Sequence, residues 1–339
     1  MIINLISDTV TKPTKEMLHS MFEAEVGDDV FMQDPTVNAL QDKVAGMFGK
    51  ESALFFPSGT MANQTAIKLH TQPGDQMICD KYAHVYNYEG GGAAFNSGVT
   101  SYLIQGSRGM FKAEQLNDAI NEADNIHLPK SALVAIENTT NKGGGACWDF
   151  EELIKIKSKV KSHDLAFHLD GARLFNALVA KNQTPIQYGE LFDTISICLS
   201  KGLGAPVGSL LVGTKKDMAR ALRIRKLFGG GMRQAGYLAA AGIFALDHHV
   251  NRLEIDHQHA KLLSEGLKKC QYVAKVEPVE TNIVIFEVHD NQAEMKFMKK
   301  LEEHNILIIS MGQGKLRMVT HLDFTPVMLE KTLEVLKFM

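Results

Sequence analysis

A lysine in the second half of the chain follows an apolar, strand-like run and precedes a glycine-rich segment. The run covers residues 194–199, Lys201 comes two positions later, and glycines follow at positions 202, 204 and 208. A loop of this kind can approach a ligand closely, because glycine carries no side chain. A lysine that is buried or flanked by cations has a depressed pKa and can attack a carbonyl group. By itself, the segment fits equally well a lysine that only caps a strand.

An aspartate at the end of a second apolar run is a candidate partner. The run Ala166–Asp170 ends on the carboxylate, and Gly171, Ala172 and Arg173 follow. Ligands of parallel α/β sheets bind outside the carboxyl ends of the strands, where Asp170 and Lys201 are both expected. Pyridoxal phosphate (PLP) needs such a pair, because an acid keeps its ring nitrogen protonated while a lysine holds its aldehyde. An isolated aspartate at a strand end is more often a turn or capping residue.

A third segment offers a seat for a phosphate group. Ser58, Gly59 and Thr60 follow the strand-like run 53–56 and open a helix that continues to Leu69. Backbone N–H groups and hydroxyls at a helix N-terminus bind phosphate well, although Ser58 also fits a plain N-cap. The other glycine runs lack the strand–turn–helix context of a nucleotide-binding fingerprint.

Histidines supply further candidates. His84 comes shortly after a strand-like run, where an imidazole could stack on a flat cofactor ring, although a single histidine is more often an ordinary core or surface residue. The pairs His248/His249 and His257/His259 fall on expected helices, and we expect them to be solvated and not to bind metal. The four cysteines are scattered without a C-x-x-C pair, so we predict no metal site and no disulfide framework.

Short apolar runs alternate with amphipathic stretches through the first two thirds of the chain. This alternation predicts an α/β domain built on a mostly parallel sheet. The last two runs are so close that a turn should join them, which allows one antiparallel strand. Strands are expected at 53–56, 76–79, 101–104, 132–137, 166–170, 194–199 and 209–213. Helices are expected at 35–47, 112–124, 150–162, 232–250 and 252–269.

The pattern changes after Tyr272 to strand, helix, two strands and a final helix over residues 326–338. We predict a large domain over residues 1–248, with an N-terminal arm (residues 1–14) near the site. A smaller C-terminal α/β domain should cover residues 249–339.

The composition limits the classes of molecule that the protein is expected to bind. The 339 residues carry a net charge of −3 with no basic tail, which argues against nucleic acid and anionic membrane surfaces. The apolar runs are too short to span a bilayer, and the N-terminus lacks the features of a signal peptide. A small-molecule substrate and a cytoplasmic location are therefore expected.

Taken in order, these motifs resemble the low-specificity L-threonine aldolases, a family of fold type I PLP-dependent enzymes. The resemblance runs through essentially the whole chain. It rests on residues 7–14, 26–30, 34–40, 57–63, 83–92, 126–127, 168–177, 198–209, 229–236 and 317–323. It implies a fold type I PLP-dependent transferase-like architecture with a mostly parallel seven-stranded sheet. It also implies cleavage of L-threonine or L-allo-threonine to glycine and acetaldehyde, in threonine catabolism and glycine biosynthesis. Family members are dimers or tetramers (dimers of dimers) with active sites between subunits.

The resemblance also implies roles for the residues that match. Lys201 would bind PLP covalently, Asp170 would hold the ring nitrogen and His84 would stack on the ring. The cofactor-binding set implied for this chain is Ser58, Gly59, Thr60, His84, Asp170, Arg173, Ser200, Lys201 and Arg233, with Arg233 supplied by the same chain or across a dimer interface. The substrate carboxylate would be bound by Ser7, Arg173 and Arg317. The base for the β-hydroxyl proton is left open among His84, His127 and a water ordered by Glu89.

The sequence departs from the family pattern near the substrate. Ile6 stands where the family commonly has arginine, Phe31 where it has tyrosine, and Thr140 where it has histidine. These changes leave open the substrate range, the stereopreference at the β-carbon and whether a cation binds near Thr9 and Thr11.

Three alternative functions are less well supported by the sequence. The nearest is another fold type I lyase, either a β-eliminating enzyme or an aldolase that prefers phenylserine or serine-type substrates. A PLP-binding scaffold without turnover is disfavoured by the full set of lysine, acid and arginines. A nicotinamide dehydrogenase lacks its glycine fingerprint.

Overall fold

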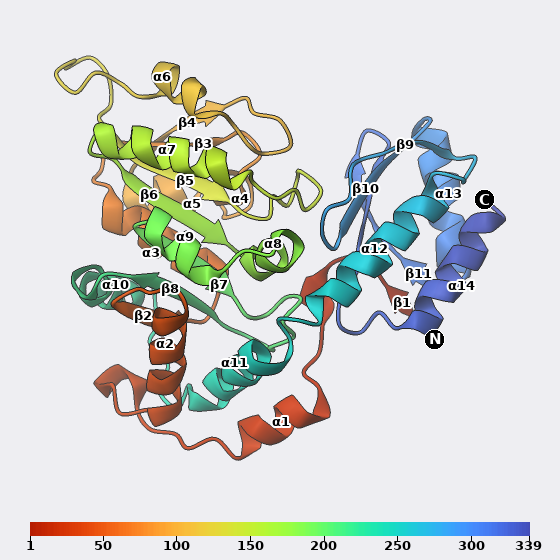
Figure 1. Cartoon of the computed structure of the whole chain (residues 1–339), viewed down its shortest axis with the longest axis horizontal. Helices are drawn as coiled ribbons and strands as arrows, with labels where there is room; N and C mark the ends of the chain where they lie inside the picture. The colour runs from red at the N-terminus through yellow and green to blue at the C-terminus, as the bar shows by residue number, and fades with distance from the viewer.

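The computed structural model describes residues 1–339, apart from the side chain of Asn291. The larger part of the chain is built on a seven-stranded sheet, whose strands lie in the order β2-β8-β7-β6-β5-β3-β4 (Figure 1). Only β8 runs antiparallel to its neighbours among these strands. The mostly parallel seven-stranded sheet with one antiparallel strand is therefore confirmed. The strands are β2 (Ser52–Phe56), β3 (Gln76–Asp80), β4 (Thr100–Ile104), β5 (Ser131–Glu137), β6 (Ala166–Gly171), β7 (Thr194–Cys198) and β8 (Ser209–Gly213).

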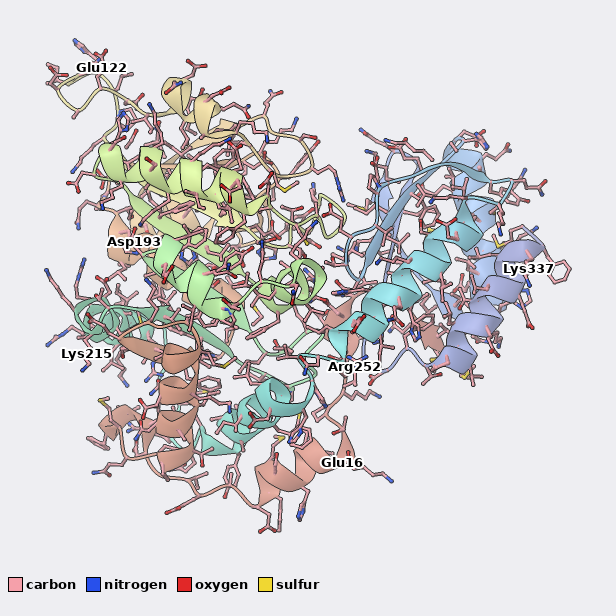
Figure 2. All side chains as sticks on the ribbon, in the orientation of Figure 1. Glu16, Glu122, Asp193, Lys215, Arg252 and Lys337 are labelled. Atoms are coloured by element: carbon pink, nitrogen blue, oxygen red, sulfur yellow. The ribbon has the colours of Figure 1, made fainter. Side chains whose placement is uncertain are left out.

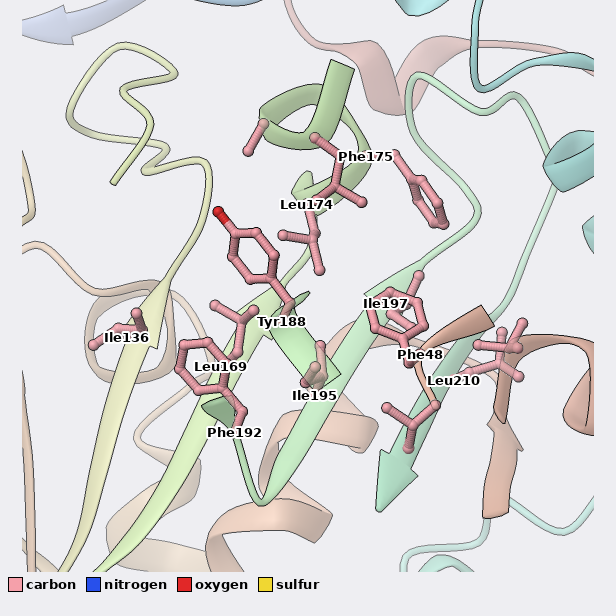
Figure 3. Close-up of a cluster of buried hydrophobic side chains, with 14 of the residues drawn as sticks. Phe48, Ile136, Leu169, Leu174, Phe175, Tyr188, Phe192, Ile195, Ile197 and Leu210 are labelled. Carbon is pink, nitrogen blue, oxygen red and sulfur yellow. The ribbon is translucent and has the colours of Figure 1, made fainter. Parts of the chain in front are cut away.

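Helices cover both faces of this sheet, which explains why its central strands are apolar throughout. Alternate residues of a strand point to opposite faces, so Leu54 and Phe56 pack with α3 (Gly59–His70) and α10 (Lys215–Leu227), whereas Phe55 belongs to the core on the other face. That second core is shown in Figure 3. It is covered by α2 (Pro35–Met47), α7 (Phe150–Ser162), α8 (Leu174–Lys181), α9 (Pro185–Leu191) and α11 (Gly236–His248).

Two of the expected helices are shorter than the sequence pattern indicates. Residues 112–124 form only a 3-10 turn (Ala113–Gln115) and the short helix α6 (Leu116–Ala119). The chain then leaves the helical path because Asn121 bonds instead to Gln76 Oε1 and to the Pro129 carbonyl. Likewise, α11 begins at Gly236 and not at Met232. The N–H of Gly236, the first residue of the helix, donates to Asp34 Oδ2 at 2.8 Å.

The C-terminal part carries an antiparallel sheet in the order β12-β13-β10-β9. These strands are β9 (Val273–Val276), β10 (Ile283–Val288), β12 (Ile309–Gly312) and β13 (Lys315–Val319), packed with α12 (Leu253–Leu267), α13 (Asn291–Glu303) and α14 (Pro326–Lys337). The smaller C-terminal α/β unit is confirmed. The boundary proposed at residues 248/249 falls in the short connection between α11 and α12, near Arg252 (Figure 2).

The first residues of the chain join the C-terminal part. Strand β1 (Ile3–Asn4) pairs in parallel with β11 (Ile306–Leu307), and Ile3 and Leu5 belong to the C-terminal core. The chain then runs back toward the large sheet through residues 7–14. None of the described helices combines the length and the apolar character that a membrane crossing requires.

Candidate active site

A cavity of about 280 Å³ lies at the carboxyl ends of β6 and β7. Its volume is close to the lower end of the usual range for small-molecule sites, about 300–1,000 Å³. Eight side chains or glycines expected from the sequence line it: Ser58, Gly59, Thr60, His84, Glu89, Asp170, Ser200 and Lys201. Two larger hollows lie elsewhere, but the polar groups singled out from the sequence do not line them.

Lys201 lies in the turn that links β7 to the antiparallel strand β8. Its carbonyl accepts hydrogen bonds from the Thr11 hydroxyl at 2.9 Å and from the Gly204 N–H at 2.8 Å. Gly204 has a φ of +80°, a conformation that L-residues rarely adopt. The amine of Lys201 lies 3.8 Å from the Cys198 thiol, which is a weak acceptor. The backbone of the lysine is therefore fixed while its amine stays available for covalent chemistry.

Asp170 is the second-last residue of β6 and is buried. Its Oδ1 accepts from the Ala172 N–H at 3.1 Å, whereas its Oδ2 has no hydrogen-bond partner among the described residues. A buried carboxylate oxygen without a partner is costly and indicates a ligand group that donates to it.

Glu137 is a buried acid that the sequence reasoning missed. It ends β5 and lies directly across from Asp170 in the sheet register. Burial and the charge of Asp170 raise the pKa of Glu137 to about 7. Its carboxylate accepts from the backbone N–H groups of His84 at 3.3 Å and Asn141 at 3.0 Å. The only signal in the sequence is its place at the end of a predicted strand next to that of Asp170.

His84 and Glu89 form a hydrogen-bonded pair at the cavity wall. His84 Nδ1 lies 3.0 Å from Glu89 Oε1. Burial by itself would lower the pKa of His84, but the bond to Glu89 and the charges of Asp170 and Glu137 outweigh it, so this pKa is raised. One ligand atom each from His84, Glu89 and Asp170 lie within 4.8 Å of one another, a spacing that could also hold a metal ion. The hydrogen bond between His84 and Glu89 accounts for that closeness without one.

The predicted phosphate seat is the N-terminus of α3. Ser58 is the N-cap and its hydroxyl accepts from the Met61 N–H at 3.2 Å, so the plain capping role is present. The same turn also faces the cavity. A Cβ on Gly59 would come within 2.5 Å of Cys198 Sγ, which explains why glycine stands there. A 12-residue helix that points its free N–H groups at the cavity suits an anion.

The N-terminal arm reaches two arginines beside the cavity. Arg173 is buried and holds Asp8 through Nε at 2.7 Å and Nη2 at 2.6 Å. Burial by itself would raise the pKa of Asp8, but the charge of the Arg173 guanidinium and its hydrogen bonds hold this pKa at about 2. Ser7, next to Asp8, accepts from the Thr9 N–H and hydroxyl. The ion pair to Asp8 was not foreseen, since Arg173 was assigned to cofactor and substrate.

Arg317 comes from β13 of the C-terminal sheet. Its Nη1 donates to Asn141 Oδ1 at 2.9 Å and its Nη2 donates to the Ile6 carbonyl at 3.1 Å. Its Nε is buried and has no partner among the described residues. Burial and the nearby charge of Arg173 lower the pKa of Arg317, and the Asp8 carboxylate offsets them only in part. The structure thus brings together Ser7, Arg173 and Arg317.

Ser7, Arg173 and Arg317 do not line the cavity directly, and neither do Arg233 and His127. Arg233 is exposed, pairs with Asp28 Oδ2 at 2.9 Å and covers the Phe31 ring. His127 is exposed in the loop that leads into the N-terminal end of β5, whereas the cavity lies at the carboxyl ends of the strands. Glu122, in the same loop, lies at the outer edge of the molecule (Figure 2).

The expectation that the paired histidines are solvated is wrong for three of them. His249, His257 and His259 are buried, while His248 is exposed. His257 bonds to Asn176 Oδ1 at 3.0 Å and His249 bonds to the Leu203 carbonyl at 2.7 Å. They fasten α11 and α12 to the large sheet domain.

Comparison with known proteins decides the family. Residues 4–291 match the family model described as beta-eliminating lyase. The chain is 42% identical over 324 residues to the low specificity L-threonine aldolase of Escherichia coli (strain K12), covering 95% of this chain and 94% of that protein. It is 39% identical over 329 residues to low-specificity L-threonine aldolase 1 of Arabidopsis thaliana, covering 95% and 92%. The chain belongs to the beta-eliminating lyase family, among the low-specificity L-threonine aldolases.

The fold agrees with this family. The solved threonine aldolase of Leishmania major aligns with a TM-score of 0.86 and 21% identity over 99% of both chains. The predicted fold class, the family resemblance and the assignment as a PLP-dependent lyase are therefore confirmed.

The residues around the cavity fit PLP. The partnerless Oδ2 of Asp170 suits a protonated ring nitrogen, and the amine of Lys201 suits the aldehyde. The turn at Gly59, at the N-terminus of α3, suits the phosphate.

Proposed function

We propose that the protein cleaves the Cα–Cβ bond of L-threonine, L-allo-threonine and related β-hydroxy-α-amino acids. The products are glycine and an aldehyde, which is acetaldehyde when threonine is the substrate. The observation that supports this most is that Lys201 and Asp170 line one cavity. Arg173 lines an adjoining smaller pocket together with Lys201, and its charge acts on Arg317. PLP, when bound, supplies the electron sink that takes up the electron pair left at Cα.

The cofactor roles follow from the cavity wall. Lys201 would bind the aldehyde carbon, Asp170 would keep the ring nitrogen protonated and His84 would cover the ring. Ser58, Gly59, Thr60 and Ser200 would hold the phosphate at the N-terminus of α3.

The arginines would select the bond that breaks. Arg317 would bind the substrate carboxylate, with Ser7 and the Nη1 group of Arg173 beside it, because Nε and Nη2 of Arg173 already hold Asp8. A carboxylate fixed by a guanidinium group cannot rotate freely. The substrate would thereby be held with Cα–Cβ, and not Cα–H, perpendicular to the plane of the cofactor.

His84 is the strongest candidate for the base that takes the β-hydroxyl proton. It lines the cavity, and its Nδ1 is engaged with Glu89, which leaves Nε2 to accept a proton. The bond to Glu89 and the charges of Asp170 and Glu137 raise the pKa of His84, which makes the ring a stronger base for this transfer. A water ordered by Glu89 remains an alternative, and His127 could act only in the cavity of another subunit.

We also propose that the protein is a homo-oligomer, a dimer or a dimer of dimers, whose active sites lie between subunits. The exposed positions of Arg233 and His127, outside their own cavity, support this arrangement. Mixing Lys201→Ala with Arg233→Ala protein tests it, because shared sites would regain activity in the hybrid. The cytoplasmic location and the part in threonine catabolism and glycine biosynthesis remain predictions.

A β-eliminating lyase is the second candidate, supported by the description of the matching family. Elimination breaks Cα–H and yields a 2-oxo acid with ammonia, whereas the aldol cleavage yields glycine with an aldehyde. Product analysis with L-threonine, L-allo-threonine, phenylserine and L-serine separates the two. Formation of a 2-oxo acid as the main product from threonine would overturn the aldolase assignment.

A further inference from the structure

A chain of buried hydrogen bonds leads away from the cavity beneath His84. It begins at the Glu89 carboxylate. One oxygen, Oε1, faces His84 Nδ1 at 3.0 Å and Asn63 Nδ2 at 2.8 Å, and the other accepts from Gln64 Nε2 at 2.6 Å. Glu89 and both amides are buried. Because an ionised carboxylate only accepts hydrogen bonds, all three groups must turn a donor toward it.

The amide of Asn63 consequently has a single orientation. Since Nδ2 faces Glu89, Oδ1 faces the opposite side, where Ser196 Oγ lies at 2.6 Å and His168 Nε2 at 3.2 Å. An amide oxygen accepts hydrogen bonds, so both neighbours donate to it. His168 therefore carries a proton on Nε2.

The protonation state of the other ring nitrogen of His168, Nδ1, follows from this assignment. Burial lowers the pKa of His168 to about 4, so the ring is neutral near pH 7. Its Nδ1 faces the Thr194 hydroxyl at 3.0 Å and the Thr194 carbonyl at 3.2 Å. Because the single proton of the neutral ring is on Nε2, the hydroxyl is the group that donates to Nδ1. Thr194 Oγ1 in turn accepts from His70 Nε2 at 3.0 Å. His70 is the last residue of α3. Every donor from His70 to Glu89 thus points in one direction.

We propose that Asn63 and His168 are positioning residues that hold the Glu89 carboxylate in one orientation and thereby keep the proton of the neutral His84 ring on Nδ1. His84 Nε2 is then the unprotonated nitrogen, ready to accept a proton in the cavity. Both residues act through Glu89. The inference rests on the proposed function, in which His84 is the base.

The charges around His84 show why this orientation matters. Three carboxyl groups face the ring from different elements: Glu89 after the short helix α4 (His84–Asn87), Asp170 at the end of β6 and Glu137 at the end of β5. The Tyr88 ring lies 5.6 Å away, centre to centre. Asp170 and Glu137 favour a proton on His84 without selecting a nitrogen. The hydrogen bond to Glu89 selects Nδ1.

The direct test is the tautomer of His84. The ring nitrogens would be observed by NMR in protein labelled with 15N-histidine, with and without PLP, and assigned by the signals lost in His84→Gln. At a pH where the ring is neutral, the wild type should carry the proton on Nδ1 alone. Asn63→Leu, which has a similar shape and no donor, should give a mixture of both tautomers. An unchanged tautomer in Asn63→Leu, or a mixture in the wild type, overturns the proposal.

Thr65→Val is the matched control. Thr65 is fully buried on the same helix, and its hydroxyl has no partner among the described residues. This variant should keep the wild-type tautomer and the wild-type activity, which separates the hydrogen-bond chain from general packing of α3.

A rescue experiment tests His168 independently, and also covers the case in which Asn63→Leu does not fold. His168→Phe removes the donor to Asn63 and should lower kcat about tenfold at a similar KM for threonine. His168→Gln keeps an N–H near the place of Nε2 and should restore most of that loss. Equal activity of the two variants would refute the positioning role. A wild-type protein that forms no glycine would instead refute the proposed function, while the tautomer measurement stands on its own.

Discussion

Arg173 and Asp8 form a buried ion pair that ties the N-terminal arm to the end of β6. The guanidinium lies 2.6 and 2.7 Å from the two oxygens of the carboxylate, and Asn282 Nδ2 donates to Oδ2 at 3.2 Å. Asn282 directly precedes β10 of the C-terminal sheet. The arm, the large sheet and the C-terminal sheet therefore meet at one carboxylate, and this contact orients Arg173 beside Arg317.

Replacing Asp8 should destabilise the protein. Asp8→Asn removes the charge that compensates the buried Arg173, and breaking such a pair costs about 3 kcal/mol or more. The pKa of Asp8 is lowered from 3.8 to about 2, so its contribution is fully present above pH 4 and is lost as the pH falls through 2. This shift corresponds to about 2 kcal/mol. Denaturant unfolding of the PLP-loaded protein at pH 7 measures the effect of the substitution. At pH 3 the difference between the two proteins should be smaller, because part of the contribution of Asp8 is lost between pH 4 and pH 3.

The control for this prediction is an aspartate–lysine pair at the surface. Asp247 pairs with Lys43 at 2.6 Å, and both side chains are solvent-accessible. Asp247→Asn should cost less than about 1 kcal/mol, because water screens exposed pairs. Equal losses in the two variants would contradict the structural role given to Asp8.

Glu137 should make stability fall as the pH rises. Its pKa is raised from 4.5 to about 7, so the folded state holds this proton more tightly than the unfolded chain does. The contribution of this proton to the free energy of unfolding is fully present below pH 4.5 and is lost as the pH rises through 7. Glu137→Gln, which mimics the protonated acid, should therefore match the wild type at pH 5 and exceed it at pH 8. If unfolding measurements at these two pH values show no difference, the pKa of Glu137 beside Asp170 is not raised.

The strands and most helices could be predicted because their signals are local. For example, the apolar period indicates α2, and the N-cap Asp34 with the proline after it marks where that helix begins. The helix expected over 112–124 failed because Asn121 bonds to Gln76, 45 positions away, and no local pattern reports such a partner.

The site residues also divide into those that local sequence signals predict and those that depend on distant partners. Lys201, Asp170 and Ser58 stand at the ends of strands or the start of a helix, so the topology of a parallel sheet places them together. The partner of Arg173 lies 165 positions away in the N-terminal arm, and the burial of His257 depends on Asn176, 81 positions away. These relations depend on how the two sheets pack, which the sequence pattern does not encode locally.

Glu89 should control the pH profile. The pKa of His84 is raised in part by its bond to Glu89. Glu89→Gln removes that charge, so the acid limb of kcat/KM for threonine should move down by about one pH unit. Glu152→Gln changes a carboxylate of α7 that pairs with the distant Lys112 and should leave the limb in place. Steady-state rates across pH 5 to 9 provide the measurement, and a limb that does not move in Glu89→Gln would exclude His84 as the group that titrates.

Arg317 should determine how the substrate is held. Its guanidinium has a buried nitrogen without a partner among the described residues, and its other contacts are neutral oxygens of Asn141 and Ile6. Arg317→Ala should therefore lower kcat/KM for threonine about 100-fold, chiefly through KM, because the loss of a charge-assisted pair removes binding to the carboxylate. Arg317→Lys keeps the charge but not the planar geometry, and should recover only part of the loss. Both variants should still take up PLP on Lys201, as followed by its visible absorbance and by fixation with borohydride. A normal KM in Arg317→Ala would place the carboxylate on Arg173, whose Nη1 group is not bound to Asp8, and would refute the role given to Arg317.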